Sequence, residues 1–170
     1  DTLSYRHISL SIFERGKYER VEGTPETHRP PAYPVYLAIN YAVFGKDSLL
    51  APVIVQHVLF FIVSIIVGYL AYQLGGLMAA VVSYGFIFTD FTVFYYFNEV
   101  LSEALFTSLL MFALFFYWQS LKMGGNRWFN VLLSGLLLTV VIFTRPVGMF
   151  LTYPMAVILG LGIYMETKSV

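Results

Sequence analysis

Two glutamates precede a long apolar stretch at a spacing that would serve chemistry carried by a helix. Glu99 and Glu103 are four residues apart, so in a helix their carboxylates project from the same side. An ionisable group beside membrane-like sequence is costly unless it has a function or finds a charge partner. We therefore expect Glu103, the deeper of the two, to be functional. Glu99 is either functional as well or only a solvated residue at the end of a loop. Asp90 is either functional or a turn-forming residue.

Arg145 would supply a matching positive charge. It is followed by Pro146 and lies between two apolar segments. A guanidinium offers planar donors that bind phosphate oxygens in pairs. The alternative is an arginine that extends to the membrane surface only to keep its charge in water. We favour phosphate binding, because the proline break directs the guanidinium toward the side on which the carboxylates are expected.

The polar amino-terminal segment contains further candidates. Asp1 would act either as the N-cap of a first helix or as a catalytic carboxylate. His28 and Arg29 precede a pair of prolines and would either shape the loop or contact substrate. Tyr5 and Tyr33, which lie in the neighbouring apolar sequence, are expected to contact substrate through their aromatic rings.

These residues belong to a chain that lipid must solvate. Of its 170 residues, 58% are hydrophobic and only 12% are charged, about half the charged share of an ordinary soluble domain. Residues 1–47 hold twelve of the twenty Asp, Glu, Lys and Arg residues. The sequence therefore predicts an all-α polytopic membrane helix bundle, in which residues 1–48 form a loop with interfacial helices and residues 49–170 form the bundle.

About five apolar segments are candidates for crossing a bilayer, for which a helix needs roughly 20 residues. Amphipathic helices are expected at 2–15 and 33–44, joined by a proline-rich loop whose backbone must be extended or turning. The five predicted spans are 49–72, 77–92, 105–121, 128–144 and 147–165. Because the chain opens at a polar segment without a starting methionine, we interpret it as a piece of a longer protein.

An even number of predicted spans separates the amino-terminal segment, the acidic stretch 90–103 and Arg145, so all three are expected on one face of the membrane. Lys122, Arg127 and Lys168 fall on the other face. Candidates far apart in the sequence would thus converge at one interface, as a site requires. Six Lys and Arg residues in the amino-terminal segment, against two in the turn after the third span, would by themselves place that face in the cytoplasm.

Several classes of function find no support in the residues. A net charge of zero and the lack of a basic cluster argue against a nucleic acid partner. Cysteine is absent, which removes disulfides, thiolate metal sites and cysteine nucleophiles. The sequence has no glycine-rich phosphate loop, Cys/His metal spacing or Ser-His-Asp elbow. No cofactor is firmly expected, although Asp1 and Glu103 would supply oxygen ligands if a divalent metal binds.

Four motifs in register with the predicted spans carry a family resemblance. DTLSY at 1–5, HRPPAYPVYLA at 28–38, VLSEALF at 100–106 and FTRPVG at 143–148 resemble the GT-C glycosyltransferases of the protein mannosyltransferase and aminoarabinose transferase type. The resemblance implies a polyprenyl-phosphate sugar donor and an acceptor hydroxyl on a glycan, lipid or protein. It also implies a bacterial or archaeal plasma membrane with the active site on the extracytoplasmic side, and this outweighs the charge count.

The same resemblance assigns roles to three residues. The family's catalytic base, an aspartate just after the first transmembrane helix, matches Asp1. Its acidic residue at the top of the fourth transmembrane helix matches Glu103, and its basic residue near the lipid phosphate matches Arg145. Thr2 stands where some members carry a second acid, so a metal-binding aspartate pair is not expected. Asp90 stands where a proline is common in the family. The family's first transmembrane helix and acceptor-specific carboxy-terminal half would lie outside this chain.

Two other classes are alternatives. In a transporter or channel subunit the two glutamates, His57 and Arg145 would line an ion or proton path. That interpretation predicts polar residues through the middle of several spans, whereas only His57 lies deep and the others cluster at one end. In a flippase-like or assembly protein the carboxylates would be structural.

Overall fold

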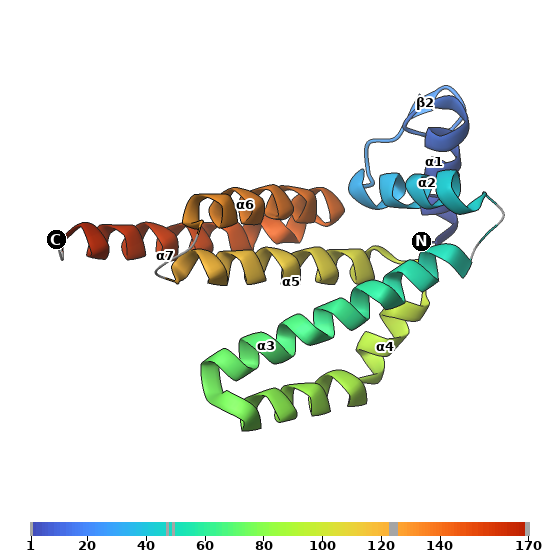
Figure 1. The fold of residues 1–170 in the computed structure, drawn as a ribbon. Helices are drawn as coiled ribbons and strands as arrows, with labels where there is room; N and C mark the ends of the chain where they lie inside the picture. Colours follow the sequence, from blue (N-terminus) through green and yellow to red (C-terminus); the bar gives the residue numbers. More distant parts are fainter. Residues whose placement is uncertain (1, 47, 49, 123–125, 169–170) are drawn as a thin grey trace.

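The chain is almost entirely helical (Figure 1). Its structure, a computed structural model, describes residues 2–46, 48, 50–122 and 126–168. The helices are α1 (Thr2–Arg15), α2 (Ala32–Phe44), α3 (Leu50–Thr89), α4 (Phe91–Asn98), α5 (Ser102–Leu121), α6 (Arg127–Thr144) and α7 (Met149–Lys168), with a short 3₁₀ helix η1 (Pro146–Gly148) between the last two. The predicted all-α class is confirmed.

Three helices in the described part of the chain, α3, α5 and α6, are long and apolar enough to cross a membrane by length and composition. They are consistent with a membrane protein. The predicted number of about five spans is not confirmed. The first two predicted spans fall largely within the 40 residues of α3, and at the fifth the apolar segment with described side chains is Pro146–Ile158.

A glycine pair divides α3 into two arms. The backbone leaves the helical conformation at Gly75 and Gly76, and the φ of 69° at Gly76 lies in the left-handed region that favours glycine. Figure 1 shows the second arm folding back toward the level at which the first began. Gly68 of the first arm lies so close to Tyr84 of the second that a Cβ atom at residue 68 would overlap the tyrosine ring.

The two arms of α3 therefore pack closely at Gly68, which has no side chain, against the large ring of Tyr84. The structure brings the start of α3 and the start of α5 to the same end of the molecule (Figure 1). The break expected between the predicted segments 49–72 and 77–92 is therefore present, and the two segments form the two helical arms of α3.

A second helix pair, α5 and α6, is antiparallel and tightly packed. Ala113 of α5 is fully buried, and its main-chain carbonyl accepts a hydrogen bond of 2.9 Å from the Ser134 hydroxyl of α6. Leu138 and Met155 join Ala113 in a small apolar core. Because the two helices run in opposite directions, the first turn of α5 lies beside the last turn of α6.

Aromatic rings seat the amino-terminal helices on this bundle. Tyr5 of α1 meets Tyr33 of α2 edge to face, with ring centroids 5.0 Å apart. Both rings are buried in a cluster with Leu37, Tyr41 and Leu105, the last from the first turn of α5. The amino-terminal helices are thereby fixed over the beginning of α5.

The predicted amphipathic character of the amino-terminal helices is not confirmed. In α1, Leu3 and Phe13 are exposed whereas Ser9 and Ser11 are buried, and α2 has apolar side chains on both its buried and its exposed side. Burial of a serine is tolerated because its hydroxyl bonds within the helix, as Ser9 does by donating to the carbonyl of Tyr5 at 2.6 Å.

The proline-rich loop contains a small antiparallel hairpin of β1 (Glu19–Val21) and β2 (Thr24–Pro25). It turns at Gly23, whose φ is 79°. The extended and turning backbone expected here is therefore present. Tyr18 anchors the hairpin, because its hydroxyl donates a hydrogen bond of 2.6 Å to the main-chain carbonyl of Arg29.

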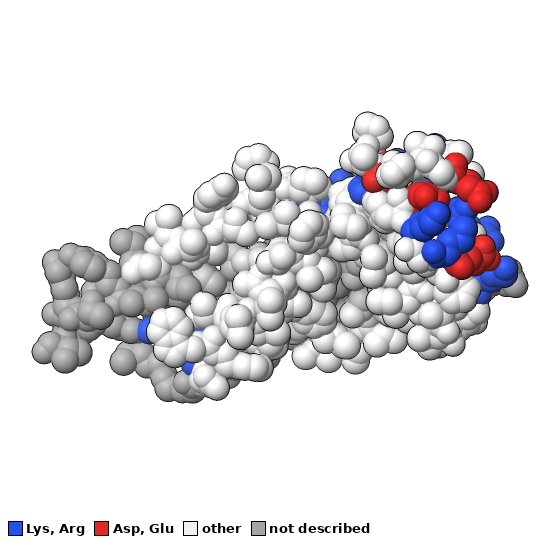
Figure 2. All heavy atoms as spheres, turned by 90° about the horizontal axis from the view of Figure 1, so that it is seen from above, with Lys and Arg blue, Asp and Glu red and all other residues white. Residues whose placement is uncertain are grey.

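The charges of this segment lie at one end of the molecule, beyond a body that is almost free of charged side chains (Figure 2). Several of them pair with one another across the surface. Glu14 lies 2.8 Å from Lys46, and Arg15 lies 3.3 Å from Glu22. The Lys46 ammonium holds the pKa of the Glu14 carboxyl below its usual range. Exposed pairs of this kind contribute little to stability individually. They join charged residues of the amino-terminal segment to one another.

Replacing Gly68 with valine is expected to destabilise the protein by about 1–3 kcal/mol, because the added side chain must displace the Tyr84 ring from packed space. Thermal unfolding of the purified protein in detergent measures the effect. Gly85→Ala is the matched control, since a Cβ at residue 85 has nothing within 4 Å. Adding Tyr84→Ala to the valine variant should recover part of the loss. An unfolding temperature unchanged by Gly68→Val would contradict close packing of the two arms.

Candidate functional site

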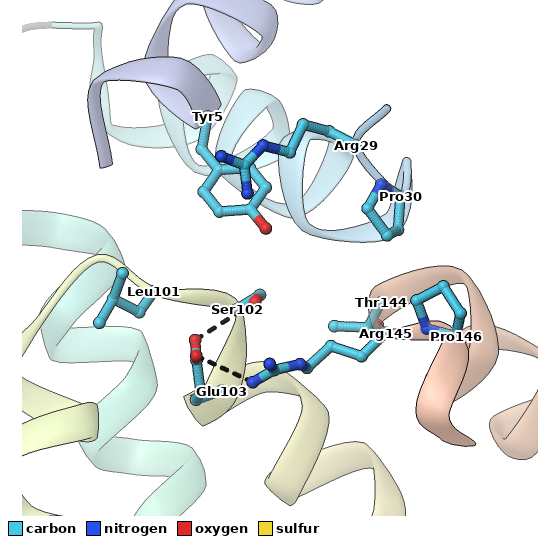
Figure 3. Close-up of a pocket in the computed structure, with 9 residues that line it drawn as sticks. All are labelled: Tyr5, Arg29, Pro30, Leu101, Ser102, Glu103, Thr144, Arg145 and Pro146. Carbon is cyan, nitrogen blue, oxygen red and sulfur yellow. Dashed lines mark hydrogen bonds and ion pairs between the residues drawn. The ribbon is translucent and has the colours of Figure 1, made fainter. Parts of the chain in front are cut away.

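A pocket of about 200 Å³ lies where the first turn of α5 meets the last turn of α6, beneath the amino-terminal helices (Figure 3). Its floor comes from α5 and from the junction of α6 with η1. Its roof comes from α1 and from the loop that precedes α2. The lining includes Tyr5, Arg29, Ser102, Glu103, Thr144 and Arg145.

An ion pair crosses the floor of the pocket. The Arg145 guanidinium lies 2.8 Å from Oε1 of Glu103, and the Ser102 hydroxyl donates to Oε2 of the same carboxylate at 3.3 Å. The Glu103 side chain is 26% exposed and that of Arg145 is 42% exposed, so both remain open to the pocket. This pair links two helices that are 42 positions apart in the sequence at one end of the bundle.

Local backbone structure explains why these two side chains meet. Glu103 lies in the first turn of α5, where the unpaired backbone N–H groups of a helix favour a negative charge. Arg145 is the residue at which α6 ends, with an extended backbone (φ −149°, ψ 123°), and Pro146 then begins η1. Proline disfavours the helical conformation of the residue before it, so Arg145 leaves the helix and turns toward α5.

The roof consists of a stacked pair. The Arg29 guanidinium lies over the ring of Tyr5, 5.1 Å from its centroid, a geometry that attracts a cation to an aromatic face. Figure 3 shows this pair on the opposite side of the pocket from Glu103 and Arg145. Tyr5 is in turn held by its edge contact with Tyr33. The pocket is therefore closed above by residues that are themselves packed.

Tyr18 fixes the main chain at Arg29 and remains protonated over a wide pH range. Burial raises the pKa of the Tyr18 hydroxyl to about 12, and the nearby Glu26 carboxylate acts in the same direction. A protonated hydroxyl can donate to the Arg29 carbonyl, which is its role here. The course of the loop that carries Arg29 thus depends on a neutral tyrosine.

A buried glutamine ties the supporting elements together. Gln56 of α3 is fully buried. Its amide nitrogen donates to the main-chain carbonyls of Phe97 at 3.3 Å and Glu99 at 2.8 Å, and its amide oxygen accepts from the Tyr33 hydroxyl at 3.3 Å. One side chain therefore joins α2, α3 and the stretch that leads into α5.

Four of the predicted site residues, Tyr5, Arg29, Glu103 and Arg145, line this one pocket. Asp1, predicted as the catalytic base, lies outside the described residues, so the structure does not place it. The predicted convergence of residues far apart in the sequence is observed for the four that line the pocket.

The other predicted contacts do not reach the pocket. Tyr33 is fully buried beneath Tyr5 and supports the roof. His28 is exposed on the hairpin side, where its backbone N–H donates to the Glu26 carboxylate at 2.7 Å. Glu99 ends α4 with an exposed side chain.

Three further acidic or polar residues have structural roles. The Asp90 carboxylate accepts from the backbone N–H groups of Thr92 and Val93 and so caps α4, which agrees with the turn-forming alternative. Ser102 and Gln56, both missed in the sequence, hold Glu103 and the stretch before it. An amide inside an otherwise apolar span was the available signal for Gln56.

Within the described ranges no group of three or more His, Cys, Asp and Glu residues is arranged to hold a metal ion. Asp1, the other carboxylate considered as a metal ligand, is not among those residues. A metal at this site therefore stays a prediction.

No protein-family model matches the chain, and no curated protein and no solved structure matches it either. The resemblance to GT-C glycosyltransferases thus stands on the four sequence motifs alone. The pocket has to be interpreted from its own chemistry.

Replacing Gln56 with leucine should destabilise the protein by about 1–3 kcal/mol, because the Tyr33 hydroxyl and the Glu99 carbonyl lose a buried partner. Unfolding in detergent would again report the loss. Gln73→Leu provides the comparison, since Gln73 lies on the same helix and is exposed. Equal stability of the Gln56 and Gln73 variants would show that the buried amide is not a structural tie.

The alkaline limit of stability should depend on Tyr18. Its pKa is about 12 in the folded chain and about 10 in an unfolded one, so the hydroxyl contributes stability that is fully present below pH 10 and lost as the pH rises through 12. At this half-buried position the contribution is about 1 kcal/mol after screening. Unfolding temperatures measured from pH 8 to pH 12 should fall more steeply in the wild type than in Tyr18→Phe. Parallel curves would contradict the assignment.

Proposed function

We propose that this chain is part of a membrane glycosyltransferase that moves a sugar from a polyprenyl-phosphate-linked donor to an acceptor hydroxyl at the extracytoplasmic face, with inversion at the sugar. The observation that carries the proposal is the Glu103–Arg145 pair in a pocket at the end of two long apolar helices. A lipid-borne phosphate would reach that guanidinium without leaving the membrane surface. The four sequence motifs support the same function.

Charge in the pocket suits such a donor. The residues that line it include two guanidiniums, from Arg29 and Arg145, and one carboxylate, from Glu103, which leaves a formal charge of +1. A phosphodiester between a sugar and a lipid carries one negative charge. Guanidinium groups bind phosphate oxygens with paired, charge-assisted hydrogen bonds. The lining thus favours an anionic diester over a neutral sugar.

The reaction would be a direct displacement. An acceptor hydroxyl oxygen bonds to the anomeric carbon while the bond from that carbon to the phosphate oxygen breaks, and Asp1 takes the hydroxyl proton. The departing phosphate gains one negative charge. Arg145 stabilises that charge where it grows, and Glu103 orients the acceptor hydroxyl.

The membrane supplies the donor and sets the geometry. The polyprenyl tail would stay among the apolar helices while its phosphate lies at their polar end. The acceptor, a glycan, a lipid or a protein, would approach from the aqueous side on which the amino-terminal segment lies. A bacterial or archaeal plasma membrane provides both components.

Asp1→Asn in the full-length protein should lower sugar transfer at least 100-fold without weakening donor binding, because the amide cannot accept the hydroxyl proton. Arg145→Gln should weaken donor binding and also slow transfer. The assay reconstitutes the protein in liposomes with polyprenyl-phosphate mannose, glucose or aminoarabinose, and measures release of free polyprenyl phosphate.

Glu22→Gln is the control variant, because Glu22 is 86% exposed and pairs only with surface Arg15 among the contacts found for it. Unchanged turnover in Asp1→Asn would remove the catalytic role of that residue. Proton-coupled flux across the liposome membrane, with no sugar transfer from any of the three donors, would favour the transporter class instead.

A further inference from the structure

The guanidinium that would bind phosphate already holds an anion. In the structure Arg145 is 2.8 Å from the Glu103 carboxylate. The contact joins the guanidinium Nη1 to Oε1 of the carboxylate. Both side chains are partly exposed to the pocket, and a soluble or lipid-borne anion can therefore approach them.

A phosphate bound at Arg145 would lie beside Glu103. Two negative charges a few ångströms apart in a partly buried pocket repel each other, and they compete for the same donors. A phosphate offers two or more oxygens to the planar guanidinium fork, the same group that Oε1 of Glu103 contacts at 2.8 Å. A bound phosphate therefore competes directly with Glu103 for Arg145.

Glu103 does not lose every partner when Arg145 leaves it. Its second oxygen accepts from Ser102 at 3.3 Å, and its position in the first turn of α5 favours a negative charge. The carboxylate therefore has a stable place to remain. Glu103 thus keeps one hydrogen-bond partner when a phosphate takes its place at Arg145.

We propose that the Glu103–Arg145 pair is a resting contact that the donor phosphate replaces, so that the Glu103 carboxylate becomes free in the pocket only after the donor has bound. This inference rests on the proposed function, because it assigns an order to the two substrates of the same site. The donor binds first and opens the pair. The acceptor hydroxyl then meets a carboxylate that was previously occupied.

The test measures donor binding separately from transfer. The full-length protein is placed in nanodiscs of phosphatidylcholine, and its affinity for polyprenyl phosphate is measured by competition with a fluorescent farnesyl phosphate. Glu103→Gln should bind polyprenyl phosphate roughly three to ten times more tightly, because a competing anion worth about that factor is removed. The same variant should transfer sugar more slowly, since it lacks the carboxylate. A purely structural role for Glu103 would weaken both.

Two further variants keep the proposal falsifiable if Glu103→Gln folds poorly. Ser102→Ala removes the second partner of the carboxylate and should weaken donor binding about twofold, because Glu103 then depends on Arg145 alone. In the double variant Glu103→Gln, Arg145→Gln the gain in affinity should vanish, since nothing remains to be released. Glu14→Gln is the matched control: it breaks an exposed ion pair of the same 2.8 Å length outside the pocket and should leave the affinity unchanged.

The outcomes separate the two proposals. If Arg145→Gln weakens phosphate binding but Glu103→Gln leaves it unchanged or weaker, the phosphate site stands and the exchange is wrong. If Arg145→Gln binds polyprenyl phosphate as tightly as the wild type, the donor site of the proposed function fails as well. Tighter binding in Glu14→Gln would show that any gain reflects overall charge, and would also overturn the exchange.

Discussion

Unpaired charge is costly along helices that are long and apolar enough to cross a membrane, and this constraint organises the described part of the molecule. In the most apolar part of each of the helices α3, α5 and α6, about a quarter of the residues are buried inside the protein, and many large apolar side chains of α3 and α6 are exposed. Ionisable groups are pushed to helix ends, where water or a charge partner is available. The antiparallel order of α5 and α6 then brings one acidic end and one basic end together.

Buried polar groups support the ends of α5 and α6 at which Glu103 and Arg145 pair. Tyr33, Gln56 and the carbonyls before α5 form a buried hydrogen-bonded set, and in surroundings of low dielectric such bonds are strong when complete. Above the set, Tyr5 joins the aromatic cluster to the Arg29 guanidinium. The pocket is thus held by a few directional contacts, while the long apolar helices place its residues at one end of the molecule.

Composition and spacing were sufficient to predict an all-helical chain, the break between residues 72 and 77, and the convergence of Glu103 and Arg145 on the same side. The first two features depend on short-range rules, namely the hydrophobicity of successive residues and the conformational freedom of glycine. The third depends on the even number of predicted crossings between the two residues. Burial in α1 could not be predicted, because Ser9 and Ser11 are buried by contacts with other segments and by bonds within the helix. Gln56 was overlooked for a similar reason, since its partners lie about 20 to 40 residues away in the sequence.

The anchoring of the roof has one more consequence, which concerns how the pocket could diversify. Tyr18 holds the loop through the backbone oxygen of residue 29, and every amino acid carries that oxygen. Any residue at position 29 would therefore supply the atom that Tyr18 binds. A substitution there would remove the stacking on Tyr5 and change the charge and shape of the roof, while this main-chain hydrogen bond could persist.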